Sequence, residues 1–232
     1  MPTQVPLLSY TRSAELQTPE QIEFDLDSYR DKNYLTHNFH PYPAKFVPQI
    51  PRRIIEALSR KDEIVIDPFC GSGTTLVEAN LLGRHGIGFD SNALAVLISR
   101  VKTTALSADS LRKIAQFLSD VGNQVQVVKG KLRIPSSSIP EFRNKDHWFE
   151  SHIQNELAFI KKLIFDVPDA RVRDFLKVAF SAIIVKASNQ DSDTRWVAVK
   201  KNLPEGFAIE AFLSKARDML SRMAEFSKVE LG

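Results

Sequence analysis

The pattern of hydrophobic and polar positions marks two short apolar runs, each followed by a segment of helical period. Residues 63–67 and 85–90 are short, apolar and end in an acid, which is typical of buried parallel strands. Residues 74–82 have helical character, and Ser91 or Asn92 can cap a further helix that reaches about residue 103. The order strand, helix, strand, helix predicts a βαβ unit, with which a doubly wound α/β sheet begins.

The remainder of the chain predicts an amino-terminal arm and a mainly helical second half. Residues 1–35 are weakly periodic and are expected to form an arm, whereas residues 36–106 hold the βαβ unit. Three prolines between positions 41 and 48 predict an extended path before a helix at about 51–60. Residues 107–232 are expected to be mainly helical. The predicted helices there lie at about 109–121 (capped by Asp109 or Ser110), 152–165, 170–187 and 207–226, with a strand or frayed helix at 124–134 and polar loops at 135–140 and 188–206.

Two predicted strands are too few for a doubly wound sheet. A two-stranded sheet is marginal in water, and its unpaired edges invite association with another chain. We therefore expect the missing strands to come from a second polypeptide or from a lost C-terminal continuation.

Composition adds few constraints. The chain is 43% hydrophobic and 25% charged, as a folded protein is, and its net charge of +3 is compatible with a nucleic-acid partner without demonstrating one. A single cysteine, Cys70, excludes an intrachain disulfide. No apolar run approaches the roughly 20 residues of a membrane span, and the first residues do not resemble a signal peptide. We expect a cytoplasmic protein with no membrane partner.

A turn containing two glycines joins the first strand to its helix, with the sequence Asp67-Pro-Phe-Cys-Gly-Ser-Gly-Thr-Thr75. Glycines allow the backbone to approach a ligand closely, and Asp90, 23 residues beyond Asp67, stands where an acid accepts hydrogen bonds from ribose. No lysine occurs between Pro68 and Arg84, which excludes a phosphate-binding P-loop. A dinucleotide site lacks its third glycine but stays open. S-adenosylmethionine fits best, because it has a ribose, no phosphate, and cationic groups that tolerate the acids.

These residues resemble a known family. Residues 67–79 look like the cofactor motif of S-adenosylmethionine-dependent DNA methyltransferases that act on the exocyclic amino group of adenine (N6) or cytosine (N4). Residues 86–95 are similar to the segment after that motif, and residues 39–46 to the segment before it. The resemblance spans about 36–104. It implies a Rossmann-like α/β fold, present here as a cofactor-binding half with a helical annex, and DNA as the partner, as in restriction-modification.

The resemblance also implies roles for individual residues. Asp90 would hold the ribose hydroxyls, with Phe89 and Ser91 beside the adenine. Asp67 would lie near the amino group of the cofactor. The other expected cofactor-binding residues are Phe69, Gly71, Gly73 and Thr74 on the motif turn, with Tyr42 and Lys45 near the carboxylate.

One family element is missing. The catalytic tetrapeptide Asp/Asn/Ser-Pro-Pro-Tyr/Phe, which grips the target amino group of a flipped base, requires a Pro-Pro pair, and the chain has none. His40-Pro41-Tyr42-Pro43 precedes the cofactor motif and matches a different segment. No catalytic residue is therefore assigned, and the isolated chain is expected to be inactive as a methyltransferase. Two alternatives stay open: a non-catalytic module that binds cofactor or DNA, and a complete enzyme with another catalytic residue and a substrate other than DNA.

Other conspicuous side chains favour ordinary structural roles. His37 and His40 are expected to be loop histidines bonded to the backbone, and Cys70 a packing residue. Arg195 is expected to form a surface ion pair, and Trp196 to be a packed aromatic.

Overall fold

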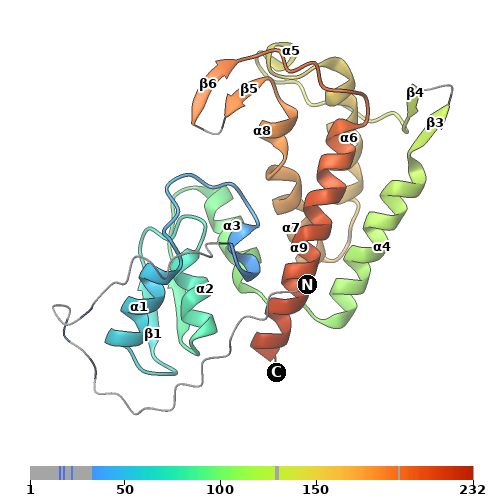
Figure 1. The fold of residues 1–232 in the computed structure, drawn as a ribbon. Helices are drawn as coiled ribbons and strands as arrows, with labels where there is room; N and C mark the ends of the chain where they lie inside the picture. The colour runs from blue at the N-terminus through green and yellow to red at the C-terminus, as the bar shows by residue number, and fades with distance from the viewer. Residues whose placement is uncertain are drawn as a thin grey trace, which may run out of the picture.

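The structure is a computed structural model that describes residues 16, 18, 22, 33–128, 131–192 and 194–231, so the predicted arm at 1–35 lies almost wholly outside the described residues. Figure 1 shows a small α/β part beside a larger helical part, with α3 at their boundary. The elements are η3 (Leu35–Asn38), α1 (Gln49–Leu58), β1 (Ile64–Asp67), α2 (Thr74–Leu81), β2 (His85–Gly88), α3 (Ala93–Thr103), α4 (Ala108–Gln124), β3 (Gln126–Val128), β4 (Lys131–Arg133), α5 (Lys145–Trp148), α6 (Ser151–Phe165), α7 (Ala170–Ser181), α8 (Ile184–Ala187), β5 (Gln190–Ser192), β6 (Arg195–Ala198) and α9 (Phe207–Leu231).

The α/β part is the predicted βαβ unit. Strands β1 and β2 are parallel, with Ile64 opposite His85 and Asp67 opposite Gly88. Helix α2 crosses between them and packs on one face of the sheet, where a Cβ atom at Gly88 would lie 2.5 Å from Leu76. Glycine in β2 is therefore required by the close approach of α2. The sequence predicted both strands and both flanking helices of this unit.

The other face of the sheet is uncovered. Ile64 and Ile66 of β1 are each 61% exposed, and Ile87 of β2 is also exposed, because alternate residues of a strand point to opposite faces. In the part of the chain that the structure describes, β1 and β2 pair only with each other. The expectation of a sheet with two strands is confirmed, and three apolar side chains lie open to solvent.

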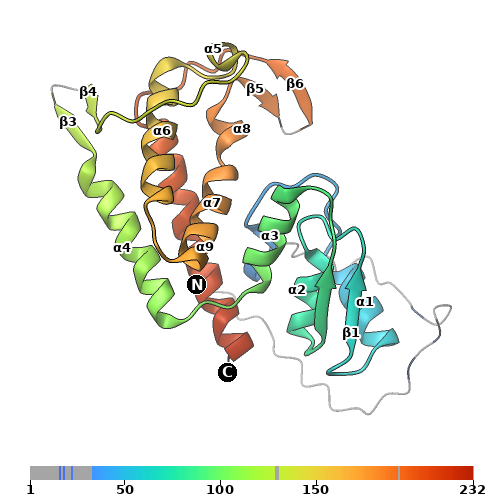
Figure 2. The same ribbon diagram turned by 180° about the vertical axis from the view of Figure 1, so that it is seen from behind.

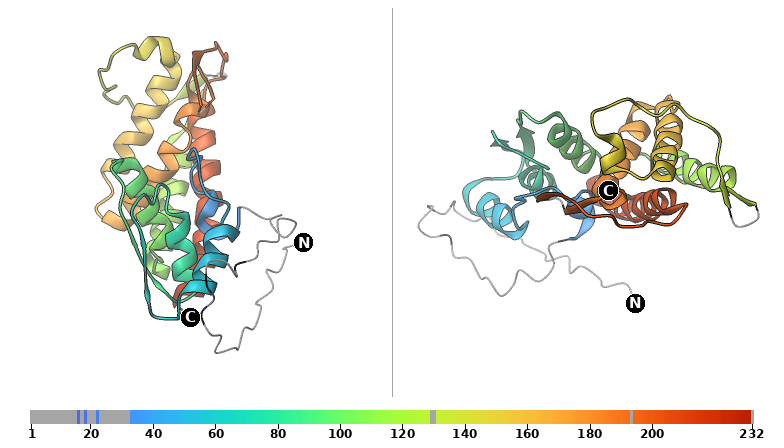
Figure 3. Two further views of the ribbon diagram at one scale, coloured as in Figure 1. Left: turned by 90° about the vertical axis from the view of Figure 1, so that its left-hand side faces the viewer. Right: turned by 90° about the horizontal axis from the view of Figure 1, so that it is seen from above.

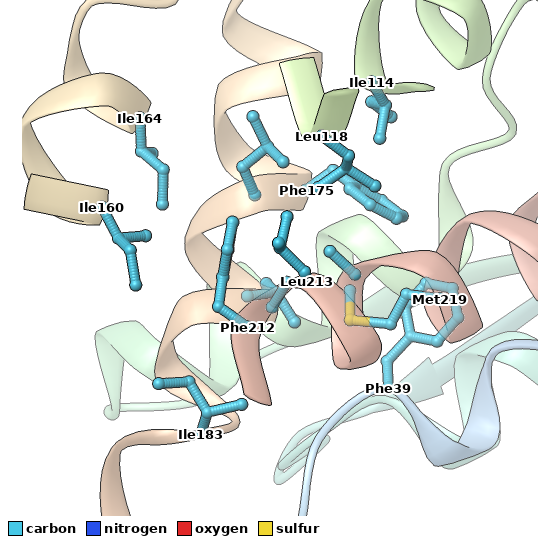
Figure 4. Packing of buried hydrophobic residues seen from close by; sticks show 14 of the residues in the cluster. Phe39, Ile114, Leu118, Ile160, Ile164, Phe175, Ile183, Phe212, Leu213 and Met219 are labelled. Carbon is cyan, nitrogen blue, oxygen red and sulfur yellow. The ribbon is translucent and has the colours of Figure 1, made fainter. Parts of the chain in front are cut away.

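The helical part is built around α9. This helix packs along α4, α6 and α7, and its side chains Phe212 and Met219 are fully buried with Phe175 of α7 (Figure 4). Glu156 of α6 caps the start of α9, because its carboxylate accepts hydrogen bonds from the backbone N–H groups of Gly206 (2.7 Å) and Ala208 (2.8 Å).

The segment before α1 joins the two parts. Phe39 is completely buried in the helical core, and its ring meets that of Phe175 edge to face at 6.0 Å between centroids (Figure 4). Lys215 of α9 donates a hydrogen bond to the carbonyl of Asn38 at 2.6 Å. The views in Figures 2 and 3 place this segment and α3 between the sheet and the helices. One continuous core therefore underlies both parts.

Several predicted boundaries need correction. The helix expected at 170–187 is two helices, α7 and α8, because the chain turns at residues 182 and 183. The ambiguous segment 124–134 forms the antiparallel pair β3–β4, and the polar loop at 188–206 contains the hairpin β5–β6. Helix α4 is capped by Ser107, whose hydroxyl accepts from the Ser110 N–H, so the expected cap at Asp109 or Ser110 was wrong.

The hairpin contains Arg195 and Trp196, and the prediction for one of these two side chains was wrong. Arg195 pairs with Asp191 at 3.0 Å, as predicted, but Trp196 is 81% exposed and is therefore not a packed aromatic. None of the described helices is long and apolar enough to cross a membrane.

Candidate cofactor site

Two carboxylates lie at the carboxyl edge of the sheet, where β1 and β2 end. Asp67 closes β1, and its Oδ1 accepts a hydrogen bond from the Phe69 N–H at 3.1 Å. Asp90 follows β2. Its Oδ2 accepts from the Gly71 N–H at 2.9 Å and its Oδ1 from the Asn92 N–H at 2.8 Å. Asp90 thus ties together the two loops that leave the sheet, while the side chain of Asn92 caps α3.

The two glycines of the motif turn are required by backbone conformation. Gly71 and Gly73 have φ angles of +49° and +78°, in the left-handed region that side chains disfavour. A Cβ atom at Gly73 would also lie 2.5 Å from the Ser99 hydroxyl of α3, whereas one at Gly71 would lie 3.4 Å from the Tyr42 ring. Gly73 lets α2 begin close against α3, and Gly71 lets the turn pass under Tyr42.

Predicted cofactor-binding residues from segments that are far apart in the sequence lie close together at this turn. The Tyr42 ring lies against Gly71, and its hydroxyl is 3.4 Å from the Asn92 side-chain amide, which donates to it. Lys45 donates hydrogen bonds to the carbonyls of His37 (3.3 Å) and His40 (3.4 Å), and burial lowers the pKa of its ammonium. The segment that precedes α1 (residues 33–48, the closing segment) therefore lies over the turn at residues 67–75 (the motif turn).

The remaining predicted cofactor-binding residues differ in how far their side chains are exposed to solvent. Phe69 is 87% exposed and Phe89 59% exposed, although both are large aromatic side chains. Ser91 is exposed beside Asp90, whereas Thr74 is buried at the first residue of α2. The carboxyl edge is thus an open surface with two uncovered rings. A hollow lined by Gly122 and Ile209 lies elsewhere, between α4 and α9.

A buried ionic cluster behind the turn was not predicted. Glu78 of α2 is completely buried, and its carboxylate accepts from the Tyr34 hydroxyl, the His37 ring (2.6 Å) and the Arg52 guanidinium (3.2 Å). Burial of an unpaired charge is unfavourable, and hydrogen bonds from these three partners offset that cost. In the sequence, the one indication of this cluster is an acid, Glu78, on the apolar side of the predicted helix 74–82.

The two histidines of the closing segment contact side chains, and His40 also contacts the backbone, as expected. His37 contacts Glu78, and His40 lies 3.1 Å from the Ser181 hydroxyl of α7. Burial and the nearby Lys215 ammonium lower the pKa of His40 to about 4, so its ring is neutral at pH 7. Burial raises the pKa of the Cys70 thiol, and Cys70 is a buried packing residue, as predicted.

A second unpredicted group lies beneath the turn. Lys102 of α3 is only 1% exposed, and its ammonium donates to the Ser72 carbonyl of the motif turn at 2.8 Å. Burial and, second, the nearby Lys45 charge lower the pKa of Lys102 to about 7. No group of three or more histidine, cysteine, aspartate or glutamate residues within the described ranges could hold a metal ion.

Comparison with known proteins finds related sequences. Residues 7–100 match the family model described as DNA methylase. The type II methyltransferase M.MvaI of Kocuria varians is 32% identical over 158 residues, which make up 67% of this chain and 35% of that protein. M.MjaII of Methanocaldococcus jannaschii, also a type II methyltransferase, is 38% identical over 93 residues, 40% of this chain and 18% of its own.

A tRNA (guanine(10)-N2)-dimethyltransferase of Methanocaldococcus jannaschii is 38% identical over 69 residues, 26% of this chain and 19% of its own length. No solved structure matches. The matched part of this chain spans about a third, or less, of these relatives. The family model and the type II methyltransferases agree on one assignment, and the chain belongs to the DNA amino-methyltransferase family.

Proposed function

We propose that this chain forms the S-adenosylmethionine-binding part of a DNA methyltransferase that modifies an exocyclic amino group of adenine or cytosine. The observation that carries the proposal is the meeting of Asp90, Gly71 and Tyr42 at the carboxyl edge of β1 and β2. In open α/β sheets of the Rossmann-like class, ligands bind outside the carboxyl ends of the strands. The three-part division into an arm (1–35), a cofactor region (36–106) and a helical region (107–232) belongs to the same proposal.

The residues present fit this cofactor. Each oxygen of the Asp90 carboxylate accepts one backbone N–H, which leaves a lone pair on each for a ribose hydroxyl. Phe89 and Phe69 offer exposed ring faces for the adenine and the methionine chain, with Ser91 next to Asp90. Asp67 supplies a negative charge for the amino group, and Lys45 a positive charge for the carboxylate. The bound cofactor would supply the methyl group from its sulfonium.

We further propose that the catalytic tetrapeptide comes from a partner chain or a C-terminal continuation. The chain contains no Pro-Pro pair, and the matched part covers 35% of M.MvaI. The uncovered face formed by Ile64, Ile66 and Ile87 supports the proposal, because Rossmann-like sheets are covered on both faces. Further strands and their helices would bury this face and complete the base pocket.

The test of the cofactor site is a calorimetric titration of wild type and Asp90→Ala with S-adenosylmethionine. Charge-assisted hydrogen bonds from the ribose to a carboxylate contribute about 1.5–3 kcal/mol, so we expect the dissociation constant to rise by one to two decades. Thermal unfolding of both proteins shows whether the loops that Asp90 ties together stay folded. An unchanged affinity in a folded variant would remove Asp90 from the site.

The absence of a Pro-Pro pair also favours a second candidate, a non-catalytic module that binds the cofactor and regulates a partner. A genomic neighbour that encodes the tetrapeptide, and restores methyl transfer to DNA when co-expressed, supports the divided enzyme. Cofactor binding without methyl transfer in every such combination supports the module. Methyl transfer by the purified chain alone contradicts both.

A further inference from the structure

Two lysines from different segments place positive charge behind the motif turn. The Lys102 ammonium is buried beneath the turn and bonds the carbonyl of Ser72, and the Lys45 ammonium bonds the carbonyls of His37 and His40. Among the described residues, neither forms an ion pair with a carboxylate within 4.0 Å. The two ammonium groups are close enough for Lys45 to disfavour the charge on Lys102.

The carboxylate that favours the charge on Lys102 forms no ion pair with either lysine. Glu78 favours the charge on Lys102 from a distance, but its oxygens already accept from Tyr34, His37 and Arg52. Arg52 brings a further positive charge, which Glu56 offsets at 3.3 Å. The charged groups that act on Lys102 are thus Lys45 on the closing segment, which disfavours its charge, and Glu78 on α2, which favours it but is shared with Arg52.

A buried ammonium of this kind costs stability, because an apolar side chain of similar volume would avoid the desolvation of the charge. Its hydrogen bond fixes the peptide between Ser72 and Gly73, in the turn whose Gly71 N–H meets Asp90. A negative group bound at the turn would offset the repulsion between the two lysines. Within the proposed cofactor, the carboxylate of the methionine end is the negative group.

We propose that Lys102 is a positioning residue that, together with Lys45, makes the motif turn selective for ligands that carry a carboxylate. The inference rests on the proposed function, because it assumes that an adenosine ligand binds at this edge. Lys102 acts from beneath the turn, through the Ser72 peptide and through its charge, and need not touch the ligand.

The experiment compares two ligands that share the 5′-thioadenosine part and differ in the amino-acid end, which carries both the carboxylate and an ammonium group. S-adenosylhomocysteine carries the amino-acid end, and 5′-methylthioadenosine lacks it. Calorimetric titrations use wild type, Lys102→Met, Lys45→Met and the control Arg100→Met, which removes a cation from an exposed position of the same helix. Lys102→Met should fold, since an apolar chain of similar length replaces a buried charge, and Lys45→Met provides an independent variant on another segment.

We expect Lys102→Met and Lys45→Met each to weaken S-adenosylhomocysteine about tenfold or more, and 5′-methylthioadenosine by less than about twofold. Arg100→Met should change neither. Equal weakening of both ligands by Lys102→Met, or no change in either, overturns the selectivity while leaving the proposed function in place. If wild type binds neither ligand, the proposed function fails, and this inference fails with it.

Discussion

At the scale of single residues, Glu78 shows how a motif can carry more than the residues that meet the ligand. Its carboxylate lies on the side of α2 that faces away from solvent and holds Tyr34, His37 and Arg52. These partners come from the closing segment and from α1, so one buried acid fixes the position of both relative to the motif turn. The charge pattern of the sequence indicates such a residue only once the helix and its buried face are known.

Replacing Glu78 with alanine should destabilise the fold by about 3 kcal/mol, because it leaves a buried histidine and a partly buried arginine without their carboxylate. Urea unfolding followed by circular dichroism measures the change. Glu56→Ala is the matched control, since Glu56 pairs with the same arginine from an exposed position and should cost no more than about 0.5 kcal/mol. Equal effects of the two variants would show that the buried cluster does not stabilise the fold.

The two glycines Gly73 and Gly122 should respond in opposite directions to alanine. Gly73→Ala forces a left-handed residue against Ser99 and should cost about 2 kcal/mol or more. Gly122 lies in α4 with open space around its Cβ position, so Gly122→Ala should stabilise by about 0.5–1 kcal/mol. Thermal melts of both variants give the comparison. A tolerated alanine at position 73 would mean that the turn has another conformation.

At the scale of elements, sequence periodicity predicted the parts whose burial is one-sided and regular. The strands at 63–67 and 85–90 and the helices on either side were found because apolar spacing and capping residues agree there. The hairpin β5–β6 was missed, because β5 is polar and the apolar side chains Trp196 and Val197 of β6 remain exposed. The break between α7 and α8 was missed because the apolar spacing continues through it, and only tertiary packing turns the chain.

The sequence likewise predicted one part of the candidate site and missed another. The motif turn, Asp90 and the closing segment were found by spacing and resemblance, and the structure brings Tyr42, Gly71 and Asp90 together. Lys102 and Glu78 were not found, because a lysine and an acid within helices are typical of solvated faces. Their burial follows from the packing of α2, α3 and the closing segment, which periodicity alone does not define.

At the scale of the whole molecule, the join between the two parts should be sensitive to acid. His40 is neutral in the fold with a pKa of about 4, against an ordinary value of 6.5. The unfolded chain therefore binds the proton more readily, and stability is lost as the pH falls from about 6.5 towards 4. The difference between these two pKa values of His40 corresponds to a loss of about 3 kcal/mol in the free energy of unfolding over that pH window.

The free energy of unfolding from urea melts at several pH values tests the effect. The wild-type value should fall between pH 6.5 and 4, and His40→Gln should lose about 3 kcal/mol less over the same range. Part of the dependence should remain, because burial also lowers the pKa of His37. Parallel curves for wild type and His40→Gln would contradict a buried neutral histidine.

The central claim is that the carboxyl edge of β1 and β2 binds S-adenosylmethionine, and hydrogen exchange with mass spectrometry tests it most directly. Amides at 67–74 and 88–92 should exchange more slowly when the cofactor is added, because both loops would lie against it. Amides of the hairpin β5–β6 should be unaffected. Asp90→Ala should reduce the protection at a cofactor concentration close to the wild-type dissociation constant. Protection confined to the helical part, or absent at saturating cofactor, would contradict the account.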